Sequence, residues 1–367
     1  MSTRREVALL LRASAPSDGP LVPEPDLAQL DWAYLLDTAF RHRVAALVGS
    51  RMVADGWFEP EGRQDYVQDA LLSAYALNSS RNRVLLGESV RLVELLRARG
   101  VAVALRKGAY LAPAVYRDPG LRPMSDIDIF VERAQARSVA EVLEAEGYVA
   151  GSVDARGTIR ALTRRQNVFW NVHVNNLPTF HRPGSGPIQR TVSVDVCFDL
   201  FLPASGSSLP ASVLLDEVVD FESCGVRVPV FRPEHFLLDV AAHLHKESTT
   251  LRYIEKLKHQ RLLQYVDVVS LIAANPRLDW TVLLDTALTA HASRNVYFAL
   301  ANAEELFPGR VPYDVLARLA ADGEVPDGFL TEYAAVDLDT PLHWSSSRIA
   351  DRLFSDERPR AASRSPI

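Results

Sequence analysis

Lysine and cysteine are scarce in this chain of 367 residues. Only four of its 40 basic residues are lysines, and its two cysteines are Cys197 and Cys224. Two cysteines cannot form a disulfide framework, and their spacing matches no zinc motif, so we expect free thiols in a reducing compartment. Because lysines are so few, each one is a candidate functional residue. They are Lys107, Lys246, Lys256 and Lys258.

The chain also lacks long apolar runs and an excess of positive charge. No stretch approaches the ~18 consecutive apolar residues that a membrane span requires, and the apolar run at residues 7–11 is too short for a signal peptide. We therefore expect a cytoplasmic protein without a membrane partner. The net charge of −6 argues against a nucleic-acid partner bound through a broadly basic surface, although it leaves room for a local basic groove.

The order of hydrophobic patterns predicts an α+β protein with a mixed sheet flanked by helices. The predicted parts are an N-terminal helical region (1–99), an α/β core (100–232), a C-terminal helical domain (233–335) and a tail (336–367) that is disordered at its end. Gly100 is expected to end the helix before the core, where a left-handed residue is favoured.

Within these parts, the period of the apolar residues changes between helix and strand. The predicted strands are 101–105, 126–131, 167–175 and 191–199, and the predicted helices include 109–116, 133–146, 251–274 and 280–305. The last two strands alternate apolar and polar residues, which is typical of a sheet with one buried face. In residues 167–175, Trp170 is expected in the core and His173 on the polar face, as a candidate for an acceptor pocket.

Asp126 and Asp128 stand two residues apart at the start of the second predicted strand. Because side chains alternate along a strand, both carboxylates project from one face, while Ile127 and Ile129 point to the other. Two carboxylates so placed repel each other unless a cation lies between them. Mg²⁺ prefers such oxygen ligands together with substrate phosphates. The pair therefore predicts a divalent-metal site for a nucleoside triphosphate (NTP).

The segments around this pair strengthen the prediction. Lys107 and Gly108 form a turn at the end of the preceding strand, where backbone N–H groups can receive phosphate. Asp195 lies on the polar face of the strand 191–199, together with Asp199. We expect Asp195 to be a third carboxylate that binds metal and acts as a base for an attacking hydroxyl.

These features resemble the DNA polymerase β-like nucleotidyltransferase superfamily. The resemblance is closer to an uncharacterised bacterial branch found in biosynthetic and polysaccharide gene neighbourhoods. The segments that carry it are 105–111, 116–129 and 147–148, and with the flanking helices it extends over roughly residues 30–275. Two positions depart from the superfamily pattern. Gly108-Ala109 replaces the usual Gly-Gly or Gly-Ser, and Asp195-Val196-Cys197 replaces the acid-x-His of this branch, which leaves Asp199 as an alternative third acid.

The resemblance implies a two-metal mechanism. Two Mg²⁺ ions would be held by Asp126, Asp128 and Asp195 around the triphosphate, and Asp195 would help to deprotonate the acceptor. Gly108 would let the backbone approach the triphosphate. The other residues expected at the nucleotide are Lys107, Arg122, Ser125, Lys246 and Arg252.

The function expected from these residues is transfer of a nucleoside monophosphate from an NTP, with ATP favoured, to a hydroxyl-type group of an acceptor. We favour a small molecule or a peptide natural product as the acceptor, with release of pyrophosphate. A second hypothesis is a toxin-like transferase that modifies a tRNA or a protein, although the acidic net charge disfavours tRNA. A third is a catalytically inactive module that binds a nucleotide or a partner.

Other candidate residues have plainer interpretations. His243 and His245 are two apart on a predicted helix and do not share a face, which disfavours a zinc site. His243 is expected to contact Asp239, four residues earlier. Cys197 is expected to be a passive neighbour of the third acid. Lys246, Arg252, Lys256 and Lys258 form a basic cluster that is either a solvated helix face or a rim that binds the triphosphate or the acceptor.

Overall fold

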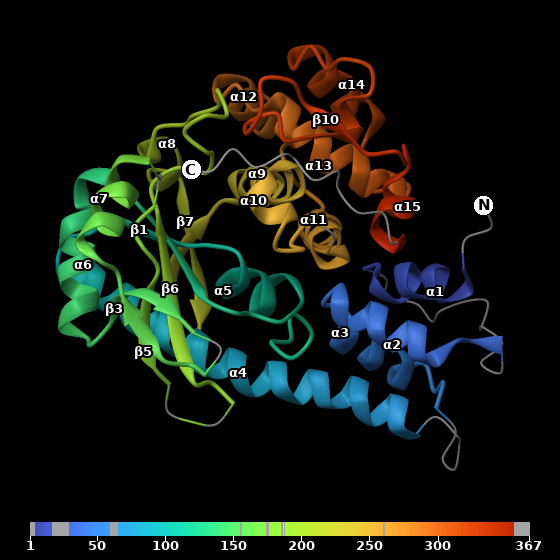
Figure 1. Cartoon of the computed structure of the whole chain (residues 1–367), viewed down its shortest axis with the longest axis horizontal. Helices are drawn as coiled ribbons and strands as arrows, with labels where there is room; N and C mark the ends of the chain where they lie inside the picture. The colour runs from blue at the N-terminus through green and yellow to red at the C-terminus, as the bar shows by residue number, and fades with distance from the viewer. Residues whose placement is uncertain are drawn as a thin grey trace.

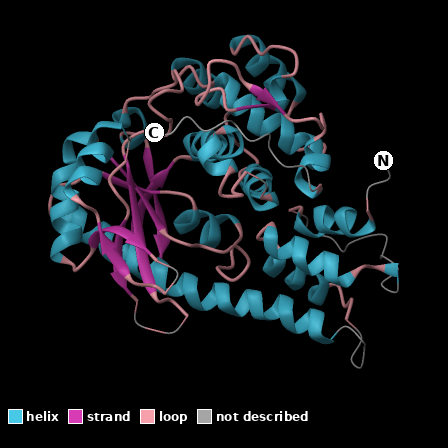
Figure 2. Ribbon diagram, viewed as in Figure 1, coloured by secondary structure: helices cyan, strands magenta, loops and turns pink. Residues whose placement is uncertain are grey.

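The computed structural model shows a large sheet with helices on both faces, a long helix below it and a group of C-terminal helices (Figure 1). It describes residues 4–16, 29–58, 65–154, 156–173, 176–184, 186, 188–259 and 261–355. Strands gather in the middle of the chain, between helical regions that precede and follow them (Figure 2). The predicted α+β class is therefore confirmed. The end of the tail, expected to be disordered, lies outside the described residues.

Four helices precede the sheet. They are α1 (Arg5–Ser14), α2 (Trp32–Arg41), α3 (Ala45–Ala54) and α4 (Asp65–Ala98). Asp31 caps α2 by accepting a hydrogen bond from the backbone N–H of Tyr34. The long helix α4 packs against α3 and also against the sheet. Gly100, with φ of 73°, follows the end of α4 as predicted.

The eight strands form one mixed sheet in the order β4-β3-β5-β6-β2-β1-β8-β7. They are β1 (Val103–Leu105), β2 (Ile127–Val131), β3 (Val149–Val153), β4 (Ile159–Ala161), β5 (Phe180–Pro183), β6 (Thr191–Cys197), β7 (Val218–Ser223) and β8 (Val226–Phe231). Strand β2 runs parallel to β6, and β1 runs parallel to β8, whereas the other neighbours are antiparallel. The parallel pair β2–β6 brings together segments that lie more than 60 residues apart in the sequence.

Short helical segments connect these strands. They are α5 (Gly108–Tyr110), the π-helical η2 (Leu111–Val115), the 3₁₀ turn η3 (Arg133–Gln135), α6 (Ala136–Ala145), α7 (Arg164–His173) and α8 (Ala211–Leu215). The helix predicted at 109–116 is therefore one α-helical turn that continues into a π-helical one. Gly147, with φ of 80°, follows α6.

The C-terminal helices begin with α9, whose first residue is Pro233, as is favoured at the first helical position. The elements are α9 (Pro233–Thr249), α10 (Leu251–Ile254), α11 (Leu262–Ala274), α12 (Trp280–Thr289), α13 (Ser293–Leu306), α14 (Tyr313–Asp322), η4 (Phe329–Thr331), β9 (Glu332–Tyr333), β10 (Leu342–His343) and α15 (Ile349–Phe354). The single helices predicted at 251–274 and 280–305 were wrong. The chain breaks each of them near a residue with positive φ, at Leu257 and at His291.

The two faces of the sheet belong to different hydrophobic clusters. Ile127, Ile129 and Val131 of β2 pack with residues of α4 and α6. On the opposite face, Phe130 packs in a cluster that includes residues of α9 and α11. The alternation predicted for β2 is therefore confirmed, and the face that carries Asp128 is turned toward the C-terminal helices. Within the described residues, we find no helix with the length and apolar character needed to cross a bilayer.

The strand predicted at 167–175 was wrong, because residues 164–173 form helix α7. Val168, which was expected on the buried face, is 59% exposed. Positions two apart share a face of a strand, whereas on a helix they lie on nearly opposite sides. The period-two pattern therefore does not describe the helix that these residues form.

The contact between α3 and α4 leads to a stability prediction. A Cβ atom on Gly49 of α3 would lie 2.5 Å from Leu71 Cβ, whereas a Cβ on Gly87 of α4 would meet nothing within 4 Å. Gly49→Ala should lower the free energy of unfolding by about 1–3 kcal/mol through overpacking. Gly87→Ala should raise it by about 0.5–1 kcal/mol through helix propensity. Chemical denaturation would measure both, and equal effects of the two substitutions would contradict the packing of α3 on α4.

Candidate functional site

The candidate site is a cavity of about 330 Å³ on the face of the sheet that carries Asp128. It is lined by β2 and β6, by the turn after β1, by α9 and by the segment around the start of α11. The loop between α2 and α3 also contributes, through Arg43. All nine residues predicted to contact metal or nucleotide line it. They are Lys107, Gly108, Arg122, Ser125, Asp126, Asp128, Asp195, Lys246 and Arg252.

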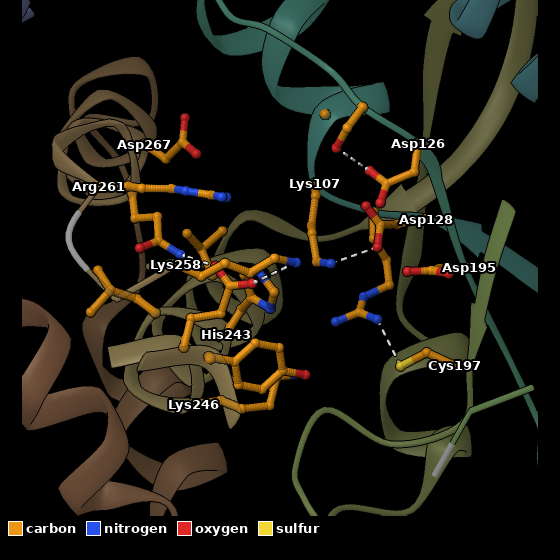
Figure 3. A pocket seen from close by; sticks show the side chains of 18 of the residues that line it. Lys107, Asp126, Asp128, Asp195, Cys197, His243, Lys246, Lys258, Arg261 and Asp267 are labelled. Atoms are coloured by element: carbon orange, nitrogen blue, oxygen red, sulfur yellow. Dashed lines mark hydrogen bonds and ion pairs between the residues drawn. The ribbon is translucent and has the colours of Figure 1, made fainter. Parts of the chain in front are cut away.

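Three carboxylates converge where β2 and β6 run side by side (Figure 3). Asp128 pairs in register with Asp195, and Asp126 directly precedes β2. Asp128 is 5% exposed, Asp126 is half-buried, and Ser125 Oγ donates a hydrogen bond to Asp126 Oδ1 at 2.9 Å. A local alternation on β2 and a long-range parallel pairing thus place acids from two strands in one site.

The charges of these acids are strongly coupled. Burial, followed by the negative charges of Asp128 and Asp195, raises the pKa of Asp126 from 3.8 to about 6. Burial also disfavours the charged form of Asp128, but the positive charges of Lys107 and Arg106 outweigh it and lower its pKa. Asp128 therefore stays charged well below neutral pH, whereas Asp126 titrates near pH 6.

Lys107 supplies the cation that faces the carboxylates. Its Nζ donates a hydrogen bond to Asp128 Oδ1 at 2.5 Å. Burial opposes its charge, yet the attraction of Asp128 raises its pKa above the ordinary value. Its backbone has φ of 44°, which an L-residue rarely adopts. The turn between β1 and α5 is therefore held in an uncommon conformation that points the ammonium at Asp128.

Gly108 is required where it stands by close packing. A Cβ at this position would lie 2.7 Å from Met124 Cγ and 3.1 Å from Arg122 Nη1. Arg122 in turn forms two hydrogen bonds of 2.8 Å with the carboxylate of Asp267 on α11, which also accepts one from Tyr116. The charge of Arg122 is thus largely neutralised within the protein.

Arg106 is a buried residue of the site that the sequence analysis missed. Its guanidinium forms two hydrogen bonds with Asp239 of α9, and its Nη1 donates to Cys197 Sγ at 2.7 Å. Its backbone N–H donates to Asp128 O. Both oxygens of Asp239 accept hydrogen bonds from Arg106, and the contact predicted between Asp239 and His243 stays a prediction. Nε2 of His243 lies 3.7 Å from Oε2 of Glu247.

Asp195 and Asp199 differ in their surroundings. Asp195 lies on β6, and its Oδ1 accepts a hydrogen bond of 2.6 Å from Thr179 Oγ1. Asp199 follows the end of β6, and its Oδ1 accepts the backbone N–H of Phe201. Both line the cavity, but only Asp195 is in register with Asp128. Thr179, which orients Asp195, is a second residue that the sequence analysis missed.

Basic side chains form the wall opposite the sheet. Lys246, Arg252 and Lys258 line the cavity, whereas Lys256 is exposed outside it. Burial, followed by the charge of Lys107, lowers the pKa of Lys246. Nζ of Lys258 lies 3.8 Å from Oε1 of Glu247. The predicted basic cluster is therefore divided between a cavity wall and a solvated residue.

His243 and His245 of α9 point to different surroundings. His243 lines the cavity, and its Nδ1 has no hydrogen-bond partner in the part of the chain that the structure describes. His245 packs against Phe298, with ring centroids 5.2 Å apart. Trp170, expected in the core, is half-buried beside the cavity and donates from Nε1 to Asn176 O at 2.9 Å. The side chain of His173 lies outside the described residues.

The acids do not form a closed metal cage. Across the described ranges, no group of three or more His, Cys, Asp or Glu side chains is arranged to hold an ion. Lys107 donates a hydrogen bond to one oxygen of Asp128, and Thr179 donates one to an oxygen of Asp195. The donor set nevertheless consists of hard oxygens, and a lysine ammonium stands where a cation would lie. Mg²⁺ needs only one or two carboxylates when phosphates and water complete its shell.

Comparison with known proteins identifies the family of the chain. A family model described as an uncharacterised nucleotidyltransferase matches residues 28–308. A solved structure, an antigenic nucleotidyltransferase-like protein from Paracoccidioides brasiliensis, is 16% identical, with 66% of this chain and 94% of that chain covered and a TM-score of 0.32. A search of curated proteins finds no match. Because the family model spans well over half of the chain, the protein belongs to this uncharacterised nucleotidyltransferase family.

Proposed function

We propose that the protein transfers a nucleoside monophosphate from an NTP, with ATP favoured, to a hydroxyl-type group of a small molecule or peptide, releasing pyrophosphate. The observation that carries this proposal is the convergence of Asp126, Asp128 and Asp195 at the parallel β2–β6 pair. Membership of a nucleotidyltransferase family supports the reaction class. The net charge of −6 favours such an acceptor over a tRNA.

The carboxylates fit a divalent-metal site in their chemistry. Burial, followed by the negative charges of Asp128 and Asp195, raises the pKa of Asp126, and Lys107 partly compensates for these charges. We propose that Asp126 and Asp128 hold two Mg²⁺ ions, with Asp195 completing the site. Bound Mg²⁺ would stabilise the charge that develops on the attacking and leaving oxygens. Lys107 would then be released from Asp128 to contact a phosphate.

The remaining residues have roles that follow from their positions. Asp195, oriented by Thr179, would accept the proton of the acceptor hydroxyl. Lys246 and Arg252 would bind phosphates from the helical wall. Arg122, already paired with Asp267, would mainly fix the turn at Gly108 and offer its Nη1 to the nucleotide. Ser125 would orient Asp126.

The role of the first two acids predicts the effect of removing either charge. Asp126→Asn and Asp128→Asn should each abolish Mg²⁺-dependent NTP binding and lower pyrophosphate release by at least about 10²-fold. Incubation of the protein with each labelled NTP, Mg²⁺ and a pool of candidate acceptors would measure release. The exposed Glu222→Gln on β7 is the control and should behave as wild type. Unchanged NTP binding in both aspartate variants would sink the proposed site.

The alternative third acids can be separated in the same assay. Asp195→Asn should lower kcat about 10²–10⁴-fold, as expected for loss of a general base. Because Asp126 and Asp128 remain, Mg–NTP should still bind to this variant. Asp199→Asn should retain most of the activity, since Asp199 accepts a backbone N–H after β6. The opposite order of effects would assign the role to Asp199.

The raised pKa of Asp126 predicts how metal-free stability depends on pH. Its folded pKa of about 6 exceeds the ordinary 3.8, so the folded protein binds more protons between these values. Stability from this group is therefore present below about pH 4 and is lost as the pH rises through 6. In the presence of a chelator, Asp126→Asn should be more stable than wild type by about 2–3 kcal/mol at pH 8. At pH 4 the difference in the free energy of unfolding between this variant and the wild type should be small.

Thermal unfolding with chelator and with Mg²⁺ would test this dependence. Added Mg²⁺ should stabilise the wild type at pH 8 and should stabilise Asp126→Asn much less. A chelated wild type that is as stable as Asp126→Asn at pH 8 would show that the carboxylates are not crowded as described.

A further inference from the structure

Arg43 connects α2 and α3 with a backbone conformation that favours glycine. Its φ is 61°, and its N–H donates to Phe40 O while that of Val44 donates to Ala39 O. This is the left-handed position that follows many helices, where a residue with a side chain is less stable than glycine. An arginine at such a position, with its side chain in the cavity, suggests a role for the guanidinium.

The neighbouring His42 fixes Arg43 against the C-terminal helices. His42 is fully buried, and burial lowers its pKa to about 3, so the neutral ring accepts a hydrogen bond. Leu262 N–H donates to His42 Nδ1 and Leu263 N–H donates to His42 O, both at 3.2 Å. These bonds place Arg43 beside Arg261, although the two residues are far apart in the sequence.

Arg43 and Arg261 have no acidic partner among the residues that the structure describes. The negative charges of Asp126 and Asp267 favour the charged form of Arg43, but neither carboxylate forms an ion pair with it among the described residues, and Asp267 is occupied by Arg122 and Tyr116. Burial, followed by the charges of Arg261 and Arg122, lowers the pKa of Arg43 to about 10. Two guanidinium groups that repel each other in a cavity form a site that an anion would stabilise.

The position of this pair within the cavity indicates which anion it meets. Arg261 lies at one side, next to Asp267, and Asp195 lies at the other, with Lys107 and the two other acids between them (Figure 3). In an in-line displacement, the attacking and leaving oxygens lie on opposite sides of the reacting phosphorus. If Asp195 accepts the proton of the acceptor, the leaving pyrophosphate lies on the side of the arginines.

We propose that Arg43 and Arg261 bind the two terminal phosphates of the NTP, so that the N-terminal helical region supplies part of the nucleotide site. This inference rests on the proposed nucleotidyl transfer. It assigns Arg43 and Arg261 to the recognition of the pyrophosphate portion, whichever base the nucleotide carries. Arginine suits this role because its planar fork donates two parallel hydrogen bonds to a phosphate.

The test uses the full chain and inorganic pyrophosphate with Mg²⁺ as the probe, measured by calorimetry. Arg43→Gly removes the guanidinium and relieves the left-handed backbone, so its Tm should not fall below that of wild type. Arg43→Gly and Arg261→Ala should each weaken pyrophosphate binding about tenfold. Both substitutions should weaken the binding of a non-hydrolysable NTP analogue to a similar extent and leave the binding of the nucleoside monophosphate unchanged. The control is Arg41→Ala, which removes one exposed charge two residues away and should change none of these.

The outcomes separate this inference from the proposed function. If NTP turnover is present but neither substitution weakens the binding of pyrophosphate or of the NTP analogue, the inference fails and the transfer reaction stands. If the substitutions raise only the KM for the acceptor, the arginines bind the acceptor instead, which also overturns it. If pyrophosphate binding depends on both arginines while no acceptor pool gives turnover, the anion site stands and the proposed reaction fails.

Discussion

The architecture of the site depends on the buried pair of Arg106 and Asp239. The guanidinium lies at the end of β1 and binds a carboxylate of α9, 133 residues away, while also contacting Cys197 of β6. Loss of one member of such a pair leaves an uncompensated buried charge, which costs about 3–5 kcal/mol. The pair therefore fixes the distance between the sheet and the helical wall. Because Lys107 directly follows Arg106, the same contact fixes the turn that points an ammonium at Asp128.

Positive and negative charges face each other across the cavity. The β2–β6 pair contributes the crowded carboxylates and the turn after β1 contributes Lys107, whereas the helical wall and the loop before α3 contribute further cations, several of which have no acidic partner among the described residues. Two of the eight described non-glycine residues with positive φ, Arg43 and Lys107, line this cavity and carry positive charge. Uncommon backbone conformation and unneutralised charge both reduce the stability of the ligand-free protein. A metal-bound triphosphate would offset the unneutralised charge, because its cations face the acids and its phosphates face the bases.

The sequence predicted the parts of the site that depend on local periodicity. The alternation in β2 placed Asp128 opposite Ile127 and Ile129, although β2 is buried on both faces, and the alternation in β6, which has one buried face, located Asp195. The same criterion was wrong for residues 164–173, which form a helix. Arg106 and Thr179 were missed because their roles depend on partners distant in sequence or across a strand pair. We propose that the boundaries near residues 99 and 232 still separate structural units, since the chain changes there from helix to strand and back.

The cavity does not belong to one of these units, because residues of all three line it. The larger hydrophobic cluster runs without interruption from α1 through one face of the sheet to α15, so the N-terminal helices share a core with the C-terminal ones. The backbone of Leu262 and Leu263 is bonded to His42, which makes the start of α11 and the end of α2 one rigid edge of the cavity. A truncated α/β core would keep the three acids and Lys107 but would lose Arg43, Lys246, Arg252 and Arg261. The helical regions therefore do more than enclose the sheet, because they supply much of the positive charge that a nucleotide requires.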